Sequence, residues 1–272
     1  MEKMSVIFFW SGLMTIGLAT LLYIVYAISR QGDTGRFGTI FAWIAAILLT
    51  GSVLTRTIAA GRGPFANMYE FSLSFGWGIL LAYVVMERQY KLRTMGAFVV
   101  PVSLLLLLYA LTVPNAVQPL VPALQNSFLL TIHVSLAIVA YAMVALAFGS
   151  AVMYLIQKSK DNKVTFLPPA EFLDNLGYKS VLIAFPFIFL MIVIGALWAD
   201  IAWGRYWGWD PKETASLVTW LIYAGYLHAR AVAGWRGKTT AVLLIIGFVA
   251  TLFTYFGVNL FLSGLHSYGG TS

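Results

Sequence analysis

Three histidines, His133, His228 and His266, are the side chains of this sequence best suited to binding a metal. The chain has no cysteine, which excludes thiolate ligands, disulfides and thiol nucleophiles. Imidazole binds zinc, copper, nickel and haem iron. A zinc site usually needs three or four protein ligands, whereas haem iron needs only one or two axial ligands because the porphyrin fills its equatorial plane. Haem therefore fits this histidine content better than zinc does.

The stretch WGRYWGWDPKET, residues 203–214, is rich in aromatic and charged side chains. Its aromatic members, separated by two glycines, are Trp203, Tyr206, Trp207 and Trp209. One or two such residues are expected at any membrane interface. A cluster this dense exceeds that need, and the glycines allow the backbone to approach a bulky planar group. Arg205 and Lys212 are either partners for the propionates of a haem or ordinary interfacial cations.

The second half of the same stretch predicts the start of a helix. Asp210 suits the N-cap position and Glu213, three residues later, can form a capping box with it, while Pro211 suits the first helical position. Capping explains these three residues without any ligand. The aromatic half is the part that capping and membrane anchoring leave unexplained.

The composition assigns the chain to the membrane. Charged residues make up 10% of the sequence, against roughly a quarter in soluble domains, and hydrophobic residues make up 60%. A soluble core of this size could not bury so much apolar surface, whereas a run of about 20 apolar residues spans a bilayer. Such runs recur to the end of the sequence, so a cleaved signal peptide is not indicated. The net charge of +7 reflects membrane orientation, and no solvated basic face suggests nucleic-acid binding.

Eight apolar runs predict an all-α, polytopic membrane protein with about eight transmembrane helices. They are Ser5–Ile28, Thr39–Ala60, Met68–Val85, Met95–Thr112, Phe128–Ile156, Val181–Trp198, Thr214–Val232 and Thr240–Leu262. No run divides the chain, so we expect a single transmembrane domain over residues 1–272. The long loop 157–179 contains Pro168 and Pro169, and we expect it to carry a short amphipathic helix from Pro169 or Ala170.

The basic residues predict that both termini are extracytoplasmic. With that orientation, most of the 17 lysines and arginines fall in cytoplasmic loops, as the positive-inside rule requires. The cytoplasmic ones are Arg30, Arg36, Arg88, Lys91, Arg93, Lys158, Lys160, Lys163, Lys179, Arg230, Arg236 and Lys238. The tryptophan-rich loop, residues 199–213, then lies on the outer face.

The predicted topology places the histidines at two depths. His133 lies near the outer end of the fifth run, and His266 lies just past the eighth, so both share the outer side with the tryptophan-rich loop. His228 follows Thr214 by 14 residues, which places it about 20 Å deeper. A histidine within a span can simply bond a neighbouring helix, and His266 alone suits an interfacial role. Intramembrane ionisable groups are nevertheless functional candidates, and two outer histidines flanking the aromatic loop favour a haem site.

The run WGRYWGWDPKETASLVTW resembles the tryptophan-rich signature, called WWD, of haem-handling proteins in cytochrome c maturation. This run, the segments GRGPFANMYEFSLSF (residues 61–75) and GLHSYGG (residues 264–270), and the eight-span plan together resemble the CcsA family of the System II pathway. In some Gram-positive bacteria, members of this family are called ResC or CcsB. The resemblance extends over essentially the whole chain. The related CcmC proteins share the signature but are expected to have fewer spans.

The resemblance implies roles for individual residues. His133 and His266 would be axial ligands of an outer haem b, and Trp203, Trp207, Trp209 and Asp210 would form its platform, with Tyr206 and Arg205 beside them. His228 would be one ligand of a deeper haem, with the second ligand from a ResB-type (CcsB) membrane subunit. The absence of a fourth histidine agrees with a ligand from another chain.

The resemblance also implies the activity. Haem would move to the outer face and be attached to the CxxCH thiols of apocytochrome c, with thiol-reducing proteins as further partners, in a bacterial plasma membrane or a thylakoid. The chain would then be a subunit of a cytochrome c synthase. Three alternatives remain: a haem transporter of the CcmC type without synthase activity, a haem-bearing electron carrier or quinol oxidoreductase subunit, and a solute transporter with an outer aromatic gate.

Overall fold

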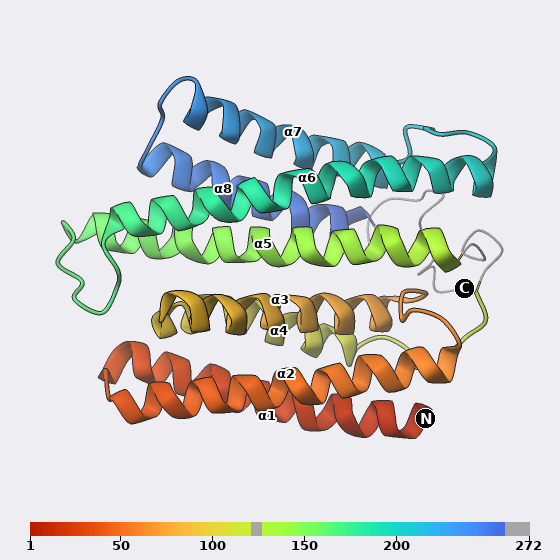
Figure 1. Ribbon diagram of the computed structural model, residues 1–272, viewed down its shortest axis with the longest axis horizontal. Coiled ribbons are helices and arrows are strands. Elements are labelled where there is room, and N and C mark those ends of the chain that lie inside the picture. Colours follow the sequence, from red (N-terminus) through yellow and green to blue (C-terminus); the bar gives the residue numbers. More distant parts are fainter. Residues whose placement is uncertain (121–126, 259–272) are drawn as a thin grey trace. The chain divides into compact units, whose positions relative to one another are not determined.

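The computed structural model describes residues 1–120 and 127–258, which contain helices and connecting segments and no strand. The all-α prediction is confirmed, because a long helix occurs at each of the eight predicted runs (Figure 1). The helices are α1 (Glu2–Ser29), α2 (Gly32–Ala60), α3 (Met68–Tyr90), α4 (Gly96–Ala110), α5 (Ser127–Ser159), α6 (Ala170–Trp203), α7 (Pro211–Ala231) and α8 (Lys238–Leu252). A 3₁₀ turn (Arg93–Met95) precedes α4, and a π-helical turn (Phe253–Gly257) follows α8.

Seven helical segments within the described residues are long and apolar enough to cross a membrane. Helices suit this setting because they satisfy their own backbone hydrogen bonds where no water is present. Helix α7 has 21 residues but is not among the seven. It carries Lys212 and Glu213 near its start and His228 and Arg230 near its end. The described residues thus contain the eight long helices α1 to α8, and the membrane crossing of α7 stays a prediction.

The loop before α6 corrects one expectation. A helix does begin at Ala170, as the Pro168-Pro169 pair predicts, but it is not a separate amphipathic segment. It continues without a break through the predicted span to Trp203, over 34 residues. Pro186 lies inside it and does not end it. The lack of a turn signal between Ala170 and the apolar run is the physical reason that the two segments form one helix.

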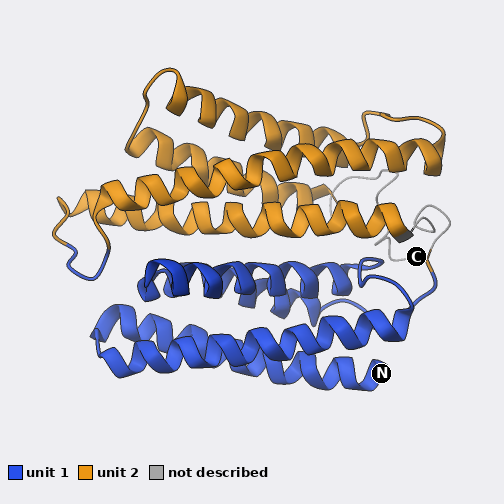
Figure 2. Ribbon diagram, viewed as in Figure 1, with its two compact units in different colours: residues 1–119, 164–167 blue, residues 120–163, 168–272 orange. Residues whose placement is uncertain are grey.

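The chain divides into two compact units (Figure 2). Unit 1 contains residues 1–119 and 164–167, and so includes α1 to α4. Unit 2 contains residues 120–163 and 168–272, and its described part includes α5 to α8. His133, His228 and the tryptophan-rich loop all belong to unit 2.

Polar side chains bind the helices of unit 1 together near the end of α3. The buried carboxylate of Glu87 accepts hydrogen bonds from the hydroxyl groups of Tyr23 (2.5 Å), Tyr83 (2.6 Å) and Thr39. The tyrosine and threonine donors come from α1, α3 and α2, so one carboxylate links three helices. A buried carboxylate is tolerated because donors surround it.

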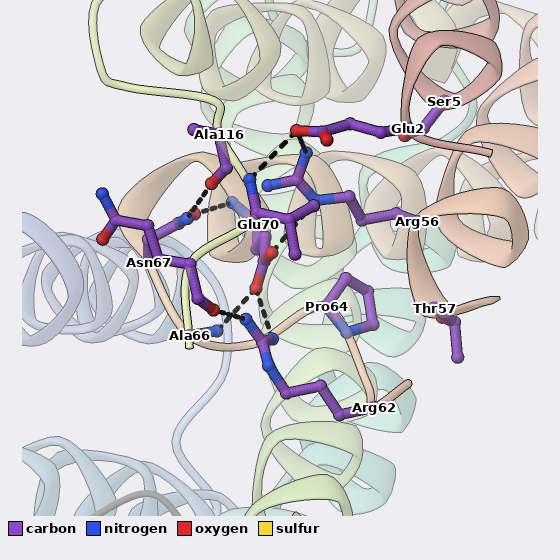
Figure 3. A network of polar contacts seen from close by, with 12 residues as sticks. Glu2, Ser5, Arg56, Thr57, Arg62, Pro64, Ala66, Asn67, Glu70 and Ala116 are labelled. Atoms are coloured by element: carbon purple, nitrogen blue, oxygen red, sulfur yellow. Dashed lines mark hydrogen bonds and ion pairs between the residues drawn. The ribbon is translucent and has the colours of Figure 1, made fainter. Parts of the chain in front are cut away.

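A second polar network lies at the start of α3 and is centred on Glu70 (Figure 3). The Glu70 carboxylate accepts hydrogen bonds from Arg56 Nε (3.0 Å), Arg62 Nη1 (2.9 Å) and the backbone N–H of Ala66 (2.8 Å). Asn67 caps α3 by accepting a hydrogen bond from the Glu70 backbone N–H. This network fixes the α2–α3 connection.

The same network reaches the segment that follows α4. Arg62 Nη2 donates to the carbonyl of Gln118 (3.0 Å), and Glu2 Oε1 accepts from the backbone N–H of Val117 (3.1 Å). The Glu2 carboxylate also lies 4.0 Å from Arg56 Nη1. The beginning of α1 and the segment after α4 are therefore held against the α2–α3 connection.

The helices of unit 2 pack through aromatic contacts and one polar cluster. Phe148 of α5 stacks on Phe248 of α8 with ring centroids 4.4 Å apart. Near the end of α7, buried Arg230 donates to Asp174 Oδ2 (2.5 Å) and Asn175 Oδ1 (3.0 Å) of α6. This cluster attaches the end of α7 to the start of α6.

The burial of Glu70 predicts that removing its carboxylate destabilises the protein far more than removing the carboxylate of Glu2, which belongs to the same network. The side chains of Glu70 and Arg56 are fully buried, whereas that of Glu2 is 51% exposed. Because Glu70→Ala leaves Arg62 without its carboxylate partner and leaves buried Arg56 with only the 4.0 Å contact to Glu2, it should destabilise the protein by about 3–5 kcal/mol. The control Glu2→Ala should cost about 1 kcal/mol or less. Thermal denaturation in detergent measures both, and equal shifts in the two variants would contradict this account of the network.

Candidate functional site

His133 lies on α5, and its ring is held by α6. The ring is partly buried, and its Nδ1 lies 2.8 Å from the backbone carbonyl oxygen of Met191. A carbonyl oxygen only accepts hydrogen bonds, so Nδ1 must carry the proton. In the neutral ring, the lone pair is then on Nε2. A metal-binding histidine usually donates its other ring N–H in this way, often to a backbone carbonyl.

Trp198 connects His133 to the tryptophan-rich loop. Its ring centroid lies 6.0 Å from that of His133 and 5.6 Å from that of Trp203. Trp198 is 3% exposed, so its position is fixed by packing. From the sequence, Trp198 is expected only as the end of the sixth apolar run. A tryptophan in the last turns of the predicted span, close in sequence to the tryptophan-rich loop, is the signal that could have identified it.

The tryptophan-rich loop begins where α6 ends. Gly204 adopts a left-handed conformation (φ 69°), and its N–H donates to the carbonyl of Asp200 (2.8 Å), which terminates the helix after Trp203. The loop and the beginning of α5 lie at the same end of unit 2 (Figure 1). His133 and Trp203 are therefore brought together through Trp198, as the predicted site requires.

The remaining aromatic residues of the loop present exposed surface. The side chains of Tyr206 and Trp209 are 59% and 70% exposed, and Trp207 packs edge-on against Trp209 with ring centroids 5.7 Å apart. Exposed large aromatic side chains at a fixed loop are available to contact a ligand. Arg205 folds back over Gly208, where an added Cβ would lie 2.8 Å from the Arg205 Nε. Gly208 thus leaves room for the Arg205 guanidinium group within the loop.

The helix start after the loop is confirmed. Asp210 is the N-cap of α7, Pro211 is its first residue, and Asp210 and Glu213 form a capping box. Glu213 Oε2 accepts hydrogen bonds from the backbone N–H groups of Asp210 (3.1 Å) and Gly208 (2.9 Å). One carboxylate therefore caps α7 and also fixes the backbone of the aromatic loop. The structure gives Asp210 a capping role whether or not a ligand binds.

His228 and His266 are not brought to His133 in the described structure. His228 is exposed on α7 and lies 17 residues after Pro211, about 25 Å along the helix from the loop. It lies two residues before the buried Arg230. His266 is outside the described residues, so its predicted place beside the loop stays a prediction.

The cations of the tryptophan-rich loop and of unit 1 differ in their surroundings. Arg56 and Arg62 of unit 1 both pair with Glu70. Glu70 itself has a structural role that accounts for its burial. Arg205 is exposed at the loop and pairs with no carboxylate within the described residues.

Comparison with known proteins places these features in a family. The family described as "Cytochrome C assembly protein" matches residues 65–266. A "Cytochrome c biogenesis protein CcsA" of Guillardia theta is 36% identical over 97% of this chain and 92% of its own length. The protein of the same name from Synechocystis is 34% identical over 88% of each chain. In Prochlorococcus marinus (strain NATL2A), the relative of this name is 33% identical over 96% of each chain.

A solved structure shares the fold. The "Cytochrome c Heme Lyase CcmF" superposes with a TM-score of 0.73 at 19% sequence identity, covering 94% of this chain. The match covers 46% of that protein, so this chain spans about half the length of CcmF. The similarity to CcmF shows a common helical membrane fold. By its family match and its near full-length relatives, the chain belongs to the cytochrome c assembly family and, within it, to the CcsA-type proteins of cytochrome c biogenesis.

Proposed function

We propose that the protein carries haem to the extracytoplasmic face and presents it there for covalent attachment to apocytochrome c, as the CcsA-type subunit of a cytochrome c synthase. The observation that carries this proposal is the hydrogen bonding of the His133 ring, which determines its protonated nitrogen beside the tryptophan-rich loop. Its Nδ1–H is donated to Met191, and its Nε2 has the lone pair that an iron ion requires. A family of cytochrome c biogenesis proteins supplies the biological context.

In this proposal, the aromatic loop receives the flat face of haem. Trp203, Trp207, Trp209 and Tyr206 supply the aromatic surface, and Arg205 supplies a charge for a propionate. Asp210 and Glu213 act indirectly, because their capping box fixes the backbone that carries the tryptophans. His266 would be the second axial ligand, so that haem b is held between two imidazoles. Axial ligation from both sides would keep the iron in a defined state until the substrate's own histidine replaces one ligand.

The attachment step needs orientation more than acid–base catalysis. Each CxxCH thiol adds across one haem vinyl group: a carbon–sulfur bond forms, the vinyl double bond becomes single, and the thiol hydrogen ends on the other vinyl carbon. The thiols belong to the substrate, which suits a chain without cysteine. Holding vinyl and thiol together in a favourable geometry could lower the barrier by about 7–11 kcal/mol. Reduction of the substrate thiols would fall to thiol-reducing partner proteins.

His228 would belong to an earlier haem position at the other end of α7. Its exposed side chain and the single histidine at that level fit a site completed by another chain. We propose a ResB-type (CcsB) membrane subunit as the source of the second ligand. Haem would enter near His228 and pass to His133 and His266.

If His133 is an axial ligand, its removal should weaken haem binding. In protein purified with its partner subunit, His133→Ala should reduce bound haem by about tenfold or more and remove the low-spin bis-histidine absorption spectrum. Millimolar imidazole should restore the spectrum by filling the vacated position. The control Ser135→Ala changes an exposed residue two positions along the same helix and should bind haem as wild type does. A wild-type haem spectrum and content in His133→Ala would reject the axial role.

The proposed passage of haem from His228 to His133 and His266 predicts that a change at His228 affects haem delivery and not the outer site itself. His228→Ala should lower the haem that reaches the outer site, while protein supplied with haem directly in detergent should still show the outer spectrum. The control Leu221→Ala changes an exposed residue two turns earlier on α7. If His228→Ala accumulates as much outer haem as Leu221→Ala in cells, haem does not pass His228.

The alternative is a haem transporter of the CcmC type, in which another protein forms the thioether bonds. The two functions separate in a purified assay with the protein, its partner subunit, haem and apocytochrome c. We expect product that retains haem on denaturing electrophoresis, because thioether bonds survive denaturation. Transfer of haem to apocytochrome c without a denaturation-resistant product would favour the transporter.

A further inference from the structure

The His133 ring contacts one face of α6. Met191, Gly195 and Trp198 follow one another at intervals of four and three residues, so they lie on the same face of the helix. The Met191 carbonyl accepts the His133 hydrogen bond, and the Trp198 ring lies beside the imidazole. Gly195 lies between them on this face and is outside the tryptophan-rich signature.

The imidazole lies directly over Gly195. A Cβ built on Gly195 would be 2.9 Å from His133 Cε1 and 3.0 Å from His133 Nδ1. Among the described residues, these two are the atoms that lie within 4 Å of that position, apart from the neighbouring backbone of α6. A methyl group at residue 195 would therefore press against the imidazole. The ring cannot yield without a cost, because its Nδ1–H is bonded to Met191 at 2.8 Å.

Helix geometry explains why a glycine is needed at this position. Each Cα–Cβ bond in an α-helix is tilted towards the N-terminus, so the Cβ of residue 195 would point towards the carbonyl of residue 191, one turn earlier. That carbonyl has two lone pairs and can accept from both the helix backbone and a side chain. With glycine at 195, a planar ring can approach the Met191 carbonyl from the side. With any other residue, the approach is obstructed.

Glycines also serve simply to let helices pack closely in membranes. Gly177, on the same helix, fits that description, because its added Cβ would meet the aliphatic side chain of Leu244 at 2.8 Å. Gly195 differs, because its neighbour is the ring of a candidate iron ligand. Its conformation is ordinary helix, so backbone freedom does not explain the glycine.

We propose that Gly195 is a positioning residue for His133: it admits the imidazole to the Met191 carbonyl, and so keeps the proton on Nδ1 and the lone pair on Nε2. The functional meaning rests on the proposed haem ligation, but the ring geometry does not depend on it. An alanine at 195 displaces the ring from the carbonyl. The proton then has no fixed site on the ring, and Nε2 no longer keeps one direction.

The first test uses haem-free protein, so that it is independent of the proposed function. The chain has three histidines, so NMR of protein with ¹⁵N-labelled imidazole rings gives few signals, and His133→Ala assigns those of His133. Wild type should show a protonated Nδ1 and an unprotonated Nε2. Gly195→Ala should abolish this pattern, whereas the control Gly17→Ala should preserve it. Gly17 is a helical glycine in α1 whose added Cβ would meet no atom of the described residues within 4 Å.

A double-mutant cycle tests whether Gly195 acts through the ring. Alanine is a better helix former than glycine, so Gly195→Ala should raise the thermal midpoint in the His133→Ala background, where the obstructing ring is absent. With His133 present, the same change should lower the midpoint. A rise of equal size in both backgrounds, or unchanged His133 signals in Gly195→Ala, would overturn the proposal.

Haem binding supplies the second readout. Gly195→Ala should bind haem about tenfold more weakly than Gly17→Ala, as expected when the support of a metal ligand is lost, and added imidazole should restore the low-spin spectrum. The positioning role of Gly195 and haem ligation by His133 can be rejected independently. If the ring signals change but neither Gly195→Ala nor His133→Ala loses haem, the positioning role stands and haem ligation by His133 is rejected. If His133→Ala loses haem and Gly195→Ala keeps both the haem and the ring signals, the positioning role is rejected.

Discussion

The hydrogen bond from His133 to the Met191 carbonyl is the interaction on which the candidate site depends. A polar ring near the end of a membrane helix must satisfy its N–H group, because an unsatisfied donor in that setting is costly. The bond satisfies the donor and at the same time determines which nitrogen carries the proton. It also brings α5 and α6 together at a point where only a residue without a side chain fits between them. One contact therefore takes part both in the chemistry of the candidate site and in the packing of α5 against α6.

The tryptophan-rich loop depends on a second constraint, the helix cap that follows it. Glu213 accepts backbone hydrogen bonds from both Asp210 and Gly208, so the start of α7 and the loop conformation are coupled. At the other end of the loop, Gly204 terminates α6 directly after Trp203. The exposed aromatic side chains thus project from a backbone that is fixed at both ends. Such fixed exposure is what a platform for a planar molecule requires, because little order must then be created on binding.

Local sequence signals predicted the parts of the structure that local physics determines. The apolar runs placed all eight helices, and Asp210, Pro211 and Glu213 correctly placed the start of α7. The same reasoning divided α6 wrongly, because polar residues near Ala170 looked like a loop although nothing there stops a helix. Membrane helices can begin well outside the apolar run, and hydropathy alone does not find their true ends.

The supporting residues of the site could not be predicted, since they depend on packing between helices. Nothing near Met191 in the sequence indicates that its backbone carbonyl meets His133, 58 positions earlier. Trp198 and Gly195 are ordinary in a transmembrane run, and only the position of α5 gives them a role. In unit 1, the sequence does not show that Glu70 and Arg56 form a buried ion pair, which only their contact in three dimensions reveals. Residue types suggested His133 as a candidate ligand, and tertiary contacts identified the residues that hold its ring.

The most direct test of the central claim is an electron cryo-microscopy map of the protein purified with haem and its partner subunit. The account predicts a haem on the tryptophan-rich loop with its iron coordinated by Nε2 of His133, while Nδ1 keeps its hydrogen bond to Met191. A haem whose iron is bound by other side chains, or a His133 ring turned so that Nδ1 faces the iron, would contradict it.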